Sequence, residues 1–203
     1  MDKFRRAIEL NGDLKALFEP SSVAVIGASS VEGKAGNAIV KNLLKFGYKG
    51  KIYPINPKEK EILGLKCYPS IKDVPDDVDL VLISIPAPLV LRAVKECVEK
   101  KVKYGVIISA GFKEATEEGA RLQEEIVKTA REGGMRLIGP NCLGIINAHK
   151  GLIAVAVDFE NFKKGSIAFM SQSGILAGAL AKWIAETQEF GIGISVSLVT
   201  SAI

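Results

Sequence analysis

A glycine loop between an apolar run and a helical pattern is the stretch best suited to bind phosphate. The apolar residues 23–26 lead directly into a small-residue loop that contains Gly27, Gly33 and Gly36, and apolar residues at helical spacing follow over 35–46. Glycines let a backbone turn sharply and approach a ligand closely. The first turn of a helix offers unpaired N–H groups and a positive dipole end. The stretch therefore predicts a phosphate-binding strand–turn–helix.

The surroundings of this loop indicate which phosphate-bearing ligand it takes. The dinucleotide fingerprint G-x-G-x-x-G is not matched, because Ala28 and Ser29 follow Gly27. Residues 33–58 contain six lysines and no acid, so the acidic residue that would hold the ribose hydroxyls of NAD is missing. Lys58, after a second predicted strand at 51–55, favours a ligand with a phosphate on its ribose. NADP and coenzyme A (CoA) both carry one.

Two other interpretations of the loop are a nucleoside-triphosphate site and a turn without a ligand. A nucleoside-triphosphate loop, G-x-x-x-x-G-K-[ST], fits poorly, because the span from Gly27 to Lys34 is one residue too long. Ala35 also replaces the hydroxyl residue that would bind magnesium. The remaining alternative is a tight turn that binds nothing.

Five predicted strands position this loop and the others like it. Apolar runs at 23–26, 51–55, 80–85, 105–109 and 136–139 alternate with helical patterns. Such alternation predicts an α/β fold with an open, doubly wound, mostly parallel sheet. In these sheets ligands bind outside the carboxyl ends of the strands, where the strand order reverses.

A second unit begins near residue 150. It has a predicted strand at 166–170, a helix after residue 174 and a strand at 192–199, and it looks unfinished. The last strand would be a sheet edge without its neighbours, which favours a homo-oligomer, a partner subunit or poor order at the C-terminus.

Composition excludes several classes of function. The 203 residues carry a mild, dispersed net charge of +4 without a basic cluster among aromatics, so nucleic acid is not an expected partner. Three widely spaced cysteines indicate neither a disulfide framework nor a metal site, which favours a cytoplasmic protein. No apolar run approaches 18 residues, so we expect no membrane span and no signal peptide.

Six motifs in order extend these inferences to a family. The motifs are SVAVIGASS at 22–30, YPINP at 53–57, ISIPA at 83–87, SAGFKE at 109–114, GPNCLG at 139–144 and SQSG at 171–174. With them the chain resembles, over about residues 14–198, the α part of ADP-forming acyl-CoA synthetases (acetyl-CoA synthetase, ADP-forming), which are relatives of the succinyl-CoA synthetase α subunit.

The resemblance implies a CoA-binding Rossmann-like domain over 1–150. Residues 151–203 would be the N-terminal fragment of a flavodoxin-like, succinyl-CoA-synthetase-like ligase domain. The glycine loop would wrap the CoA phosphates, Lys58 would meet the adenosine end, and residues 84–86 and 109–111 would line the pantetheine path. The implied cofactor-binding residues are Gly27, Ala28, Ser29, Ser30, Gly33, Asn56, Lys58, Ser84, Ile85, Pro86, Ser109, Ala110, Gly111, Asn141 and Cys142.

Some of these residues have simpler interpretations. Residues 84–86 could be a plain strand end. Asn141 and Cys142 would lie near the thiol end, but the family does not use this cysteine as a nucleophile, so packing or ligand contact is expected of it.

The family reaction is acyl-CoA + ADP + phosphate ⇌ acid + CoA + ATP, through an acyl phosphate and a phosphohistidine. The resemblance implies that a helix start formed by Ser171, Gln172, Ser173 and Gly174 faces that phosphohistidine, and a positive helix end suits a transferring phosphoryl group. A serine cap without a ligand is the alternative.

The catalytic histidine of the family would lie beyond this chain. The one histidine, His149, is in a predicted interdomain loop and matches no family position, so we expect no catalytic residue here. ATP/ADP and Mg²⁺ would be bound by missing or partner parts, including an ATP-grasp β subunit or domain. We therefore expect a truncated ligase chain that binds CoA without completing the reaction. The competing hypotheses are a stand-alone CoA- or NADP-binding regulatory module and a scaffold without a ligand.

Overall fold

The structure is a computed structural model that describes residues 14–187 and 191–197. The five predicted strands form one parallel sheet in the order β2-β1-β5-β6-β7, which confirms the predicted α/β class. Their bounds are Ser22–Ile26 (β1), Lys51–Ile55 (β2), Leu80–Ile83 (β5), Tyr104–Ile107 (β6) and Arg136–Ile138 (β7). The chain runs from β1 outward to β2 and then crosses back to β5. The strand order therefore reverses beside β1, which is where ligands bind in sheets of this kind.

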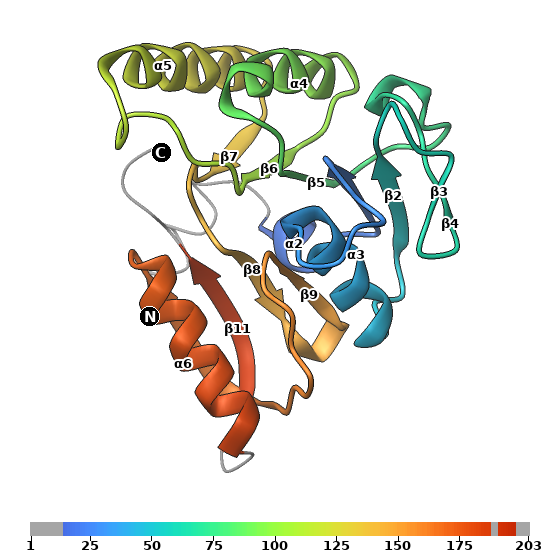
Figure 1. The fold of residues 1–203 in the computed structure, drawn as a ribbon, viewed down its shortest axis with the longest axis vertical. Helices are drawn as coiled ribbons and strands as arrows, with labels where there is room; N and C mark the ends of the chain where they lie inside the picture. Colours follow the sequence, from blue (N-terminus) through green and yellow to red (C-terminus); the bar gives the residue numbers. More distant parts are fainter. Residues whose placement is uncertain (1–13, 188–190, 198–203) are drawn as a thin grey trace, which may run out of the picture.

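Helices cover both faces of this sheet, so its central strands are apolar on both sides (Figure 1). Helices α4 (Ala87–Glu99) and α5 (Glu117–Glu132) lie on one face, over alternate strand residues such as Ala24 and Val81. Helices α2 (Lys15–Phe18) and α3 (Ala35–Lys45) lie on the other, over the intervening Val23 and Leu80. Every residue of β1 and β5 is buried, which is typical of parallel strands covered twice. The sequence over 2–18 has an amphipathic pattern that predicts a helix, and only its part from Leu14 onward lies among the described residues.

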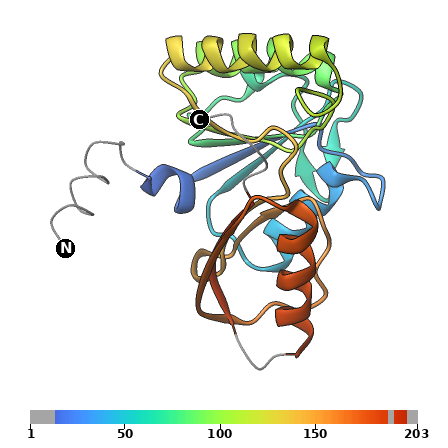
Figure 2. The ribbon, with the colours of Figure 1, turned by 90° about the vertical axis from the view of Figure 1, so that its left-hand side faces the viewer.

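A second, mixed sheet of four strands packs beneath the first, with helix α6 (Gly174–Thr187) on its outer side (Figure 2). Its order is β10-β11-β8-β9, with bounds Lys164–Ser171 (β10), Ile192–Ser197 (β11), Gly144–Asn147 (β8) and Leu152–Val155 (β9). Strands β8 and β9 form an antiparallel hairpin around the short 3₁₀ helix η2 (Ala148–Lys150). Ile145 and Leu152 of this hairpin join the core of the first sheet, whereas Ile146 and Ile153 face the core under α6.

The prediction that residues 192–199 form an open sheet edge is wrong for the part that is described. Strand β11 lies between β10 and β8, because the hairpin at 144–155 supplies the neighbour that the sequence pattern did not reveal. The argument for a homo-oligomer from that edge is therefore lost. The second sheet takes strands from both sides of residue 150, and the division of the chain there, like the flavodoxin-like nature of the second unit, stays a prediction.

The connection from β2 to β5, whose sequence predicts a loop-rich segment with one short helix at 70–73, also contains a pair of short strands. A small hairpin, β3 (Glu61–Ile62) and β4 (Leu65–Lys66), turns through Leu63 and Gly64, both at positive φ. The short helix expected at 70–73 is present as the 3₁₀ helix η1 (Ile71–Asp73), which follows the hairpin. Strand β2 is an edge of the parallel sheet, where its internal Pro54, which lacks an N–H donor, is tolerated. Among the described helices, none is both long and apolar enough to span a membrane.

Candidate functional site

The glycine loop after β1 packs tightly against the end of β5. Gly27 has φ +87°, and a Cβ atom added to it would lie 2.2 Å from the carbonyl oxygen of Ser84. A Cβ atom on Gly36, in the first turn of α3, would lie 2.0 Å from the Gly27 carbonyl oxygen. Gly33 also has positive φ but has open space around it, so only its backbone conformation favours glycine.

Two asparagine amides fix the shape of this loop. Asn37 of α3 donates to the Ser29 carbonyl oxygen at 2.8 Å, and Asn56, just after β2, donates to the Ala28 carbonyl oxygen at 2.8 Å. The other end of the Asn56 amide accepts from the Lys58 N–H at 2.9 Å. Lys34 is the N-cap of α3, and its side chain makes no capping hydrogen bond to the first turn of the helix. The loop is thus held rigidly beside an uncapped first turn.

Glu59 is a residue of this site that sequence reasoning missed. Both of its carboxylate oxygens lie 3.3 Å from the Ser30 backbone nitrogen, and one lies 3.3 Å from the Asn56 amide nitrogen. An anionic group thus occupies an N–H of the loop that was expected to bind phosphate. The signal was present, because Asn56 and Glu59 have the i, i+3 spacing with which a carboxylate reaches back to the start of a turn.

The loops after β5 and β6 are tied together by Ser109. Its hydroxyl accepts from the Ile85 N–H at 3.1 Å and donates to the Ile85 carbonyl oxygen at 2.5 Å. The Asn141 N–H, from the loop after β7, donates to the Ser109 carbonyl oxygen at 2.8 Å. The Ser109 side chain therefore holds the two loops together through Ile85. The residues that follow each partner, Pro86 and Ala110, are exposed.

A second carboxylate occupies the N–H groups of the loop after β6. One oxygen of Glu114 accepts from the Gly111 N–H at 2.8 Å and from the Phe112 N–H at 3.2 Å. Burial opposes ionisation of this carboxyl group, but the N–H donors outweigh it, so the pKa of Glu114 is lower than usual. The turn at Gly111, which has φ +100°, is thus fixed by a charged side chain.

Cys142 has the environment of a packing residue. Its side chain is buried, and its Sγ donates to the Ile107 carbonyl oxygen at 3.3 Å. Burial raises the pKa of this thiol to about 12, with backbone hydrogen bonds opposing the shift. The thiol is therefore protonated near neutral pH and unsuited to nucleophilic attack, which agrees with the packing interpretation.

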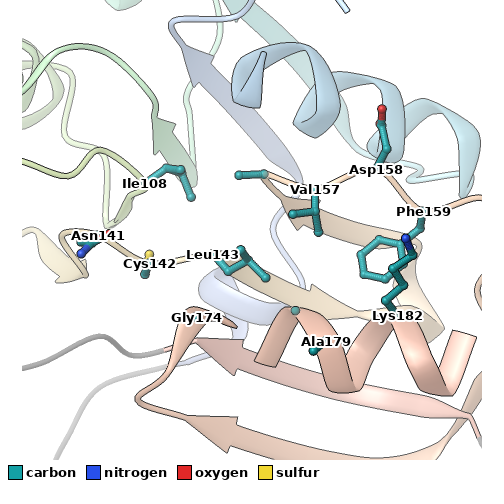
Figure 3. A pocket seen from close by; sticks show the side chains of 12 residues that line it. Ile108, Asn141, Cys142, Leu143, Val157, Asp158, Phe159, Gly174, Ala179 and Lys182 are labelled. Atoms are coloured by element: carbon teal, nitrogen blue, oxygen red, sulfur yellow. The ribbon is translucent and has the colours of Figure 1, made fainter. Parts of the chain in front are cut away.

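A cavity of about 630 Å³ joins the loop after β7 to the start of α6 (Figure 3). Asn141 and Cys142 line one side, Gly174 and Lys182 line the α6 side, and the segment after β9 closes it with Asp158. Most of the lining is apolar, with Ile108, Leu143, Val157 and Phe159 among its members. Asp158 forms an ion pair with Lys41 of α3 at 3.3 Å, so the cavity wall is linked to the helix that begins at the glycine loop.

The predicted phosphate-binding helix start carries a serine cap. The Ser173 hydroxyl accepts from the Leu176 N–H at 3.2 Å, and the Ser171 hydroxyl accepts from the Ser173 N–H at 3.1 Å. Gln172 is exposed. His149 lies in η2, inside the β8–β9 hairpin, and its Nε2 is 2.9 Å from the Gly165 carbonyl oxygen. It is exposed, and it is not among the residues that line the cavity.

Comparison with known proteins identifies the fold that carries these loops. A family model described as a CoA binding domain matches residues 21–148, which is more than half of the chain. The chain belongs to the CoA-binding domain family. The matched range contains the glycine loop, the Ser109 contacts and the Asn141–Cys142 loop.

Longer proteins contain this CoA-binding domain as one part. Acetate–CoA ligase [ADP-forming] I of Archaeoglobus fulgidus is 50% identical over 184 residues, covering 90% of this chain and 26% of the relative. Acetate–CoA ligase [ADP-forming] II subunit alpha of Pyrococcus furiosus is 47% identical over 184 residues, covering 90% of this chain and 40% of the subunit. The chain thus spans about a quarter to two fifths of the length of these relatives.

A solved structure matches nearly the whole of this chain. Acetyl-coenzyme A synthetase 1 of Ca. Korarchaeum cryptofilum, in complex with phosphate and ADP, superposes with a TM-score of 0.87 at 44% identity. The match covers 92% of this chain and 39% of that one. The resemblance to the α part of ADP-forming acetyl-CoA synthetases is therefore confirmed at the level of homology.

The structure of the CoA-binding domain brings most of the predicted residues together. Residues 27–30, 56, 84–85, 109 and 141–142 form one chain of contacts along the carboxyl ends of the strands. Gly33 and the side chains of Lys58, Pro86, Ala110 and Gln172 lie outside those contacts and are exposed. A ligand at this edge would meet these exposed positions first.

Proposed function

We propose that this chain binds CoA across the carboxyl ends of β1, β2, β5 and β6, as the CoA-binding part of an ADP-forming acyl-CoA (acetyl-CoA) synthetase. The overall reaction is acyl-CoA + ADP + phosphate ⇌ acid + CoA + ATP. The observation that carries the proposal is the contact between the Gly27 loop and Ser84 at the point where strand order reverses. The match of residues 21–148 to the CoA binding domain and the names of the relatives support it.

The geometry supports one direction for CoA along this edge. Its diphosphate would bind at the glycine loop and the start of α3, where N–H groups and the helix dipole favour anions. The exposed Lys58 would meet the 3′-phosphate. The pantetheine arm would pass Pro86 and Ala110, with Ser109 holding the two loops at a fixed separation. The thiol would then reach the cavity beside Asn141.

Phosphoryl chemistry would take place at the other side of the same cavity. Ser171, Gln172, Ser173 and Gly174 begin α6, and Gly174 lines the cavity. A positive helix end there would stabilise charge on a transferring phosphoryl group. An ATP-grasp β subunit, or a domain outside this chain, would supply the phosphohistidine and the sites for ADP/ATP and Mg²⁺. His149 is not proposed for this role, because its ring is hydrogen-bonded to the Gly165 carbonyl oxygen and it is not among the residues that line the cavity.

Two broader proposals accompany this function. Residues 1–150 would be the CoA-binding domain and residues 151–203 the N-terminal fragment of the ligase domain. We also propose a cytoplasmic location, which is supported by three cysteines, Cys67, Cys97 and Cys142, that are all free and buried.

Calorimetry with CoA, dephospho-CoA, NADPH and NAD tests the proposed ligand. We expect CoA to bind most tightly, and tighter binding of NADPH, or no binding of CoA, would refute the proposal. Lys58→Gln should weaken CoA binding about fivefold, as the loss of one exposed phosphate contact does. It should leave dephospho-CoA binding unchanged. Lys60→Gln is the matched control, because Lys60 is also exposed and two residues away.

Incubation with labelled ATP tests whether this chain can itself carry out phosphoryl transfer. We expect no label on His149 and no acyl-CoA formation without a partner that carries the remaining parts. Stable phosphorylation of His149 would refute the proposed binding role of the chain.

A further inference from the structure

Glu59 contacts the phosphate loop in a way that the proposed CoA site does not require. The residue is half-buried in the connection between β2 and β3, and its carboxylate accepts from the Ser30 N–H and the Asn56 amide at 3.3 Å. Lysines flank it on both sides, at 58 and 60. Nevertheless, no ion pair of Glu59 occurs among residues 14–187 and 191–197. The carboxylate is therefore directed to the loop rather than to the nearest cations.

A carboxylate and a phosphate would accept a hydrogen bond from the same backbone N–H group. Both are anionic oxygen acceptors, and both are favoured beside the start of a helix such as α3. If a ligand phosphate binds at this loop, it must either displace Glu59 or lie against a like charge. Asn56 makes displacement feasible, because its amide also holds Ala28 and Lys58 and would keep the loop in shape without the carboxylate.

We propose that Glu59 is an internal competitor for the phosphate of CoA, holding the Ser30 N–H in the free protein and leaving it when the ligand binds. The inference rests on the proposed function and adds to it a residue that sets affinity. Glu59 lowers the affinity for CoA and so speeds its release. The opposite role would be that of an acceptor for a ligand hydroxyl, in which Glu59 would strengthen binding.

The test compares Glu59→Gln with Glu61→Gln by calorimetry and by NMR of the Ser30 amide. Both substitutions remove one negative charge, but Glu61 lies exposed on β3, with no hydrogen bond or ion pair to the loop among the described residues. Inorganic pyrophosphate serves as a second probe beside CoA, because it carries the phosphates without adenosine or pantetheine.

We expect Glu59→Gln to tighten the binding of CoA and of pyrophosphate by about tenfold at low ionic strength, with the gain shrinking as salt screens it. Glu61→Gln should change either affinity by less than about twofold. Without ligand, the Ser30 amide resonance should move in the Glu59 variant and stay in place in the Glu61 variant.

Three outcomes would overturn the inference. These are an unmoved Ser30 resonance in the Glu59 variant, unchanged affinity, and weaker binding, the last of which would assign Glu59 to a ligand hydroxyl. If CoA does not bind but pyrophosphate still binds more tightly to the Glu59 variant, the proposed function fails, and Glu59 competes with the phosphate of a ligand other than CoA. If neither probe binds to either protein, both fail.

Discussion

Replacing Gly27 by alanine gives a quantitative test of how the loops of this site are packed. The added methyl carbon would lie 2.2 Å from the Ser84 carbonyl oxygen and 2.8 Å from the Ile85 Cγ2. Contact between such atoms is relaxed at about 3.5 Å, so one of the two loops would have to move by about 1 Å. The crowded Ser84 atom belongs to backbone, so it cannot move aside as a flexible side-chain end could.

The expected cost has two parts that can be separated. Positive φ at an alanine costs about 1 kcal/mol, and crowding of a packed region costs about 1–3 kcal/mol more. Gly33→Ala is the matched control, because Gly33 has φ +79° but nothing within 4 Å of the added carbon. We therefore expect Gly33→Ala to lower the free energy of unfolding by about 1 kcal/mol and Gly27→Ala by about 2–4 kcal/mol.

Urea unfolding of the two variants beside the parent protein measures this difference. A typical domain has about 5–15 kcal/mol of stability, so both variants should fold at low urea concentration. Gly27→Ala should also weaken CoA binding, because the displaced backbone at Ser84 and Ile85 lies on the proposed pantetheine path. Equal destabilisation by the two substitutions would refute the steric argument.

Three further predictions concern groups around the site. Asn42→Ala should lower the free energy of unfolding, measured in urea, by about 2–4 kcal/mol. The buried Asn42 amide donates to the Val157 carbonyl oxygen at 2.7 Å, and the substitution would leave that carbonyl unpaired, so a loss below about 0.5 kcal/mol would contradict this. The lowered pKa of Glu114 means that the unfolded chain, with the ordinary value of 4.5, binds the proton more tightly, so this group stabilises the fold above that pH. The stabilisation is lost as pH falls through the folded pKa, and Glu114→Gln should flatten the acid side of a plot of melting temperature against pH. Cys142, whose pKa burial raises to about 12, should resist iodoacetamide at pH 8 in the folded protein and react in urea, as peptide mapping can show.

The elements that the sequence predicted well are those with strong apolar periodicity. Strands β1 and β5 are buried on both faces and read as unbroken apolar runs, so their positions could be predicted. The β3–β4 hairpin could not, because it turns through Leu63 at φ +51°, where a two-residue turn normally has asparagine, aspartate or glycine. The residue types at 63–64 therefore gave no sufficient signal for this hairpin turn.

The second sheet shows a different limit of prediction. Strands β8 and β9 are only four residues long, and the choice of partner for β11 depends on contacts across about fifty residues. A sequence pattern gives the face of a strand but not its neighbour in space. The order of strands, and with it the internal position of β11, therefore required the structure.

The site itself was predictable as a set of loops but not as a set of contacts. Motifs located Gly27, Ser109 and Asn141 at strand ends, and the parallel topology brings such ends to one edge. The two acids, Glu59 and Glu114, were not recognised as site residues, although Glu114 ends the SAGFKE motif, because each acts by accepting hydrogen bonds from backbone N–H groups. Contacts of this kind depend on loop conformation rather than on residue type.

The polar side chains at this edge are largely engaged with the protein, and this limits how a ligand can be recognised there. The Asn56 amide holds Ala28, and the Ser109 hydroxyl holds Ile85. A phosphate-bearing ligand would therefore be recognised mainly through backbone N–H groups and the shape that the glycines permit, with Lys58 as the exposed charged contact. Many ligands share a diphosphate, so backbone recognition alone cannot select among them. Selectivity for CoA would then depend on Lys58 at one end and on the apolar cavity at the other, because only a ligand with both a ribose phosphate and a long arm can reach from one to the other.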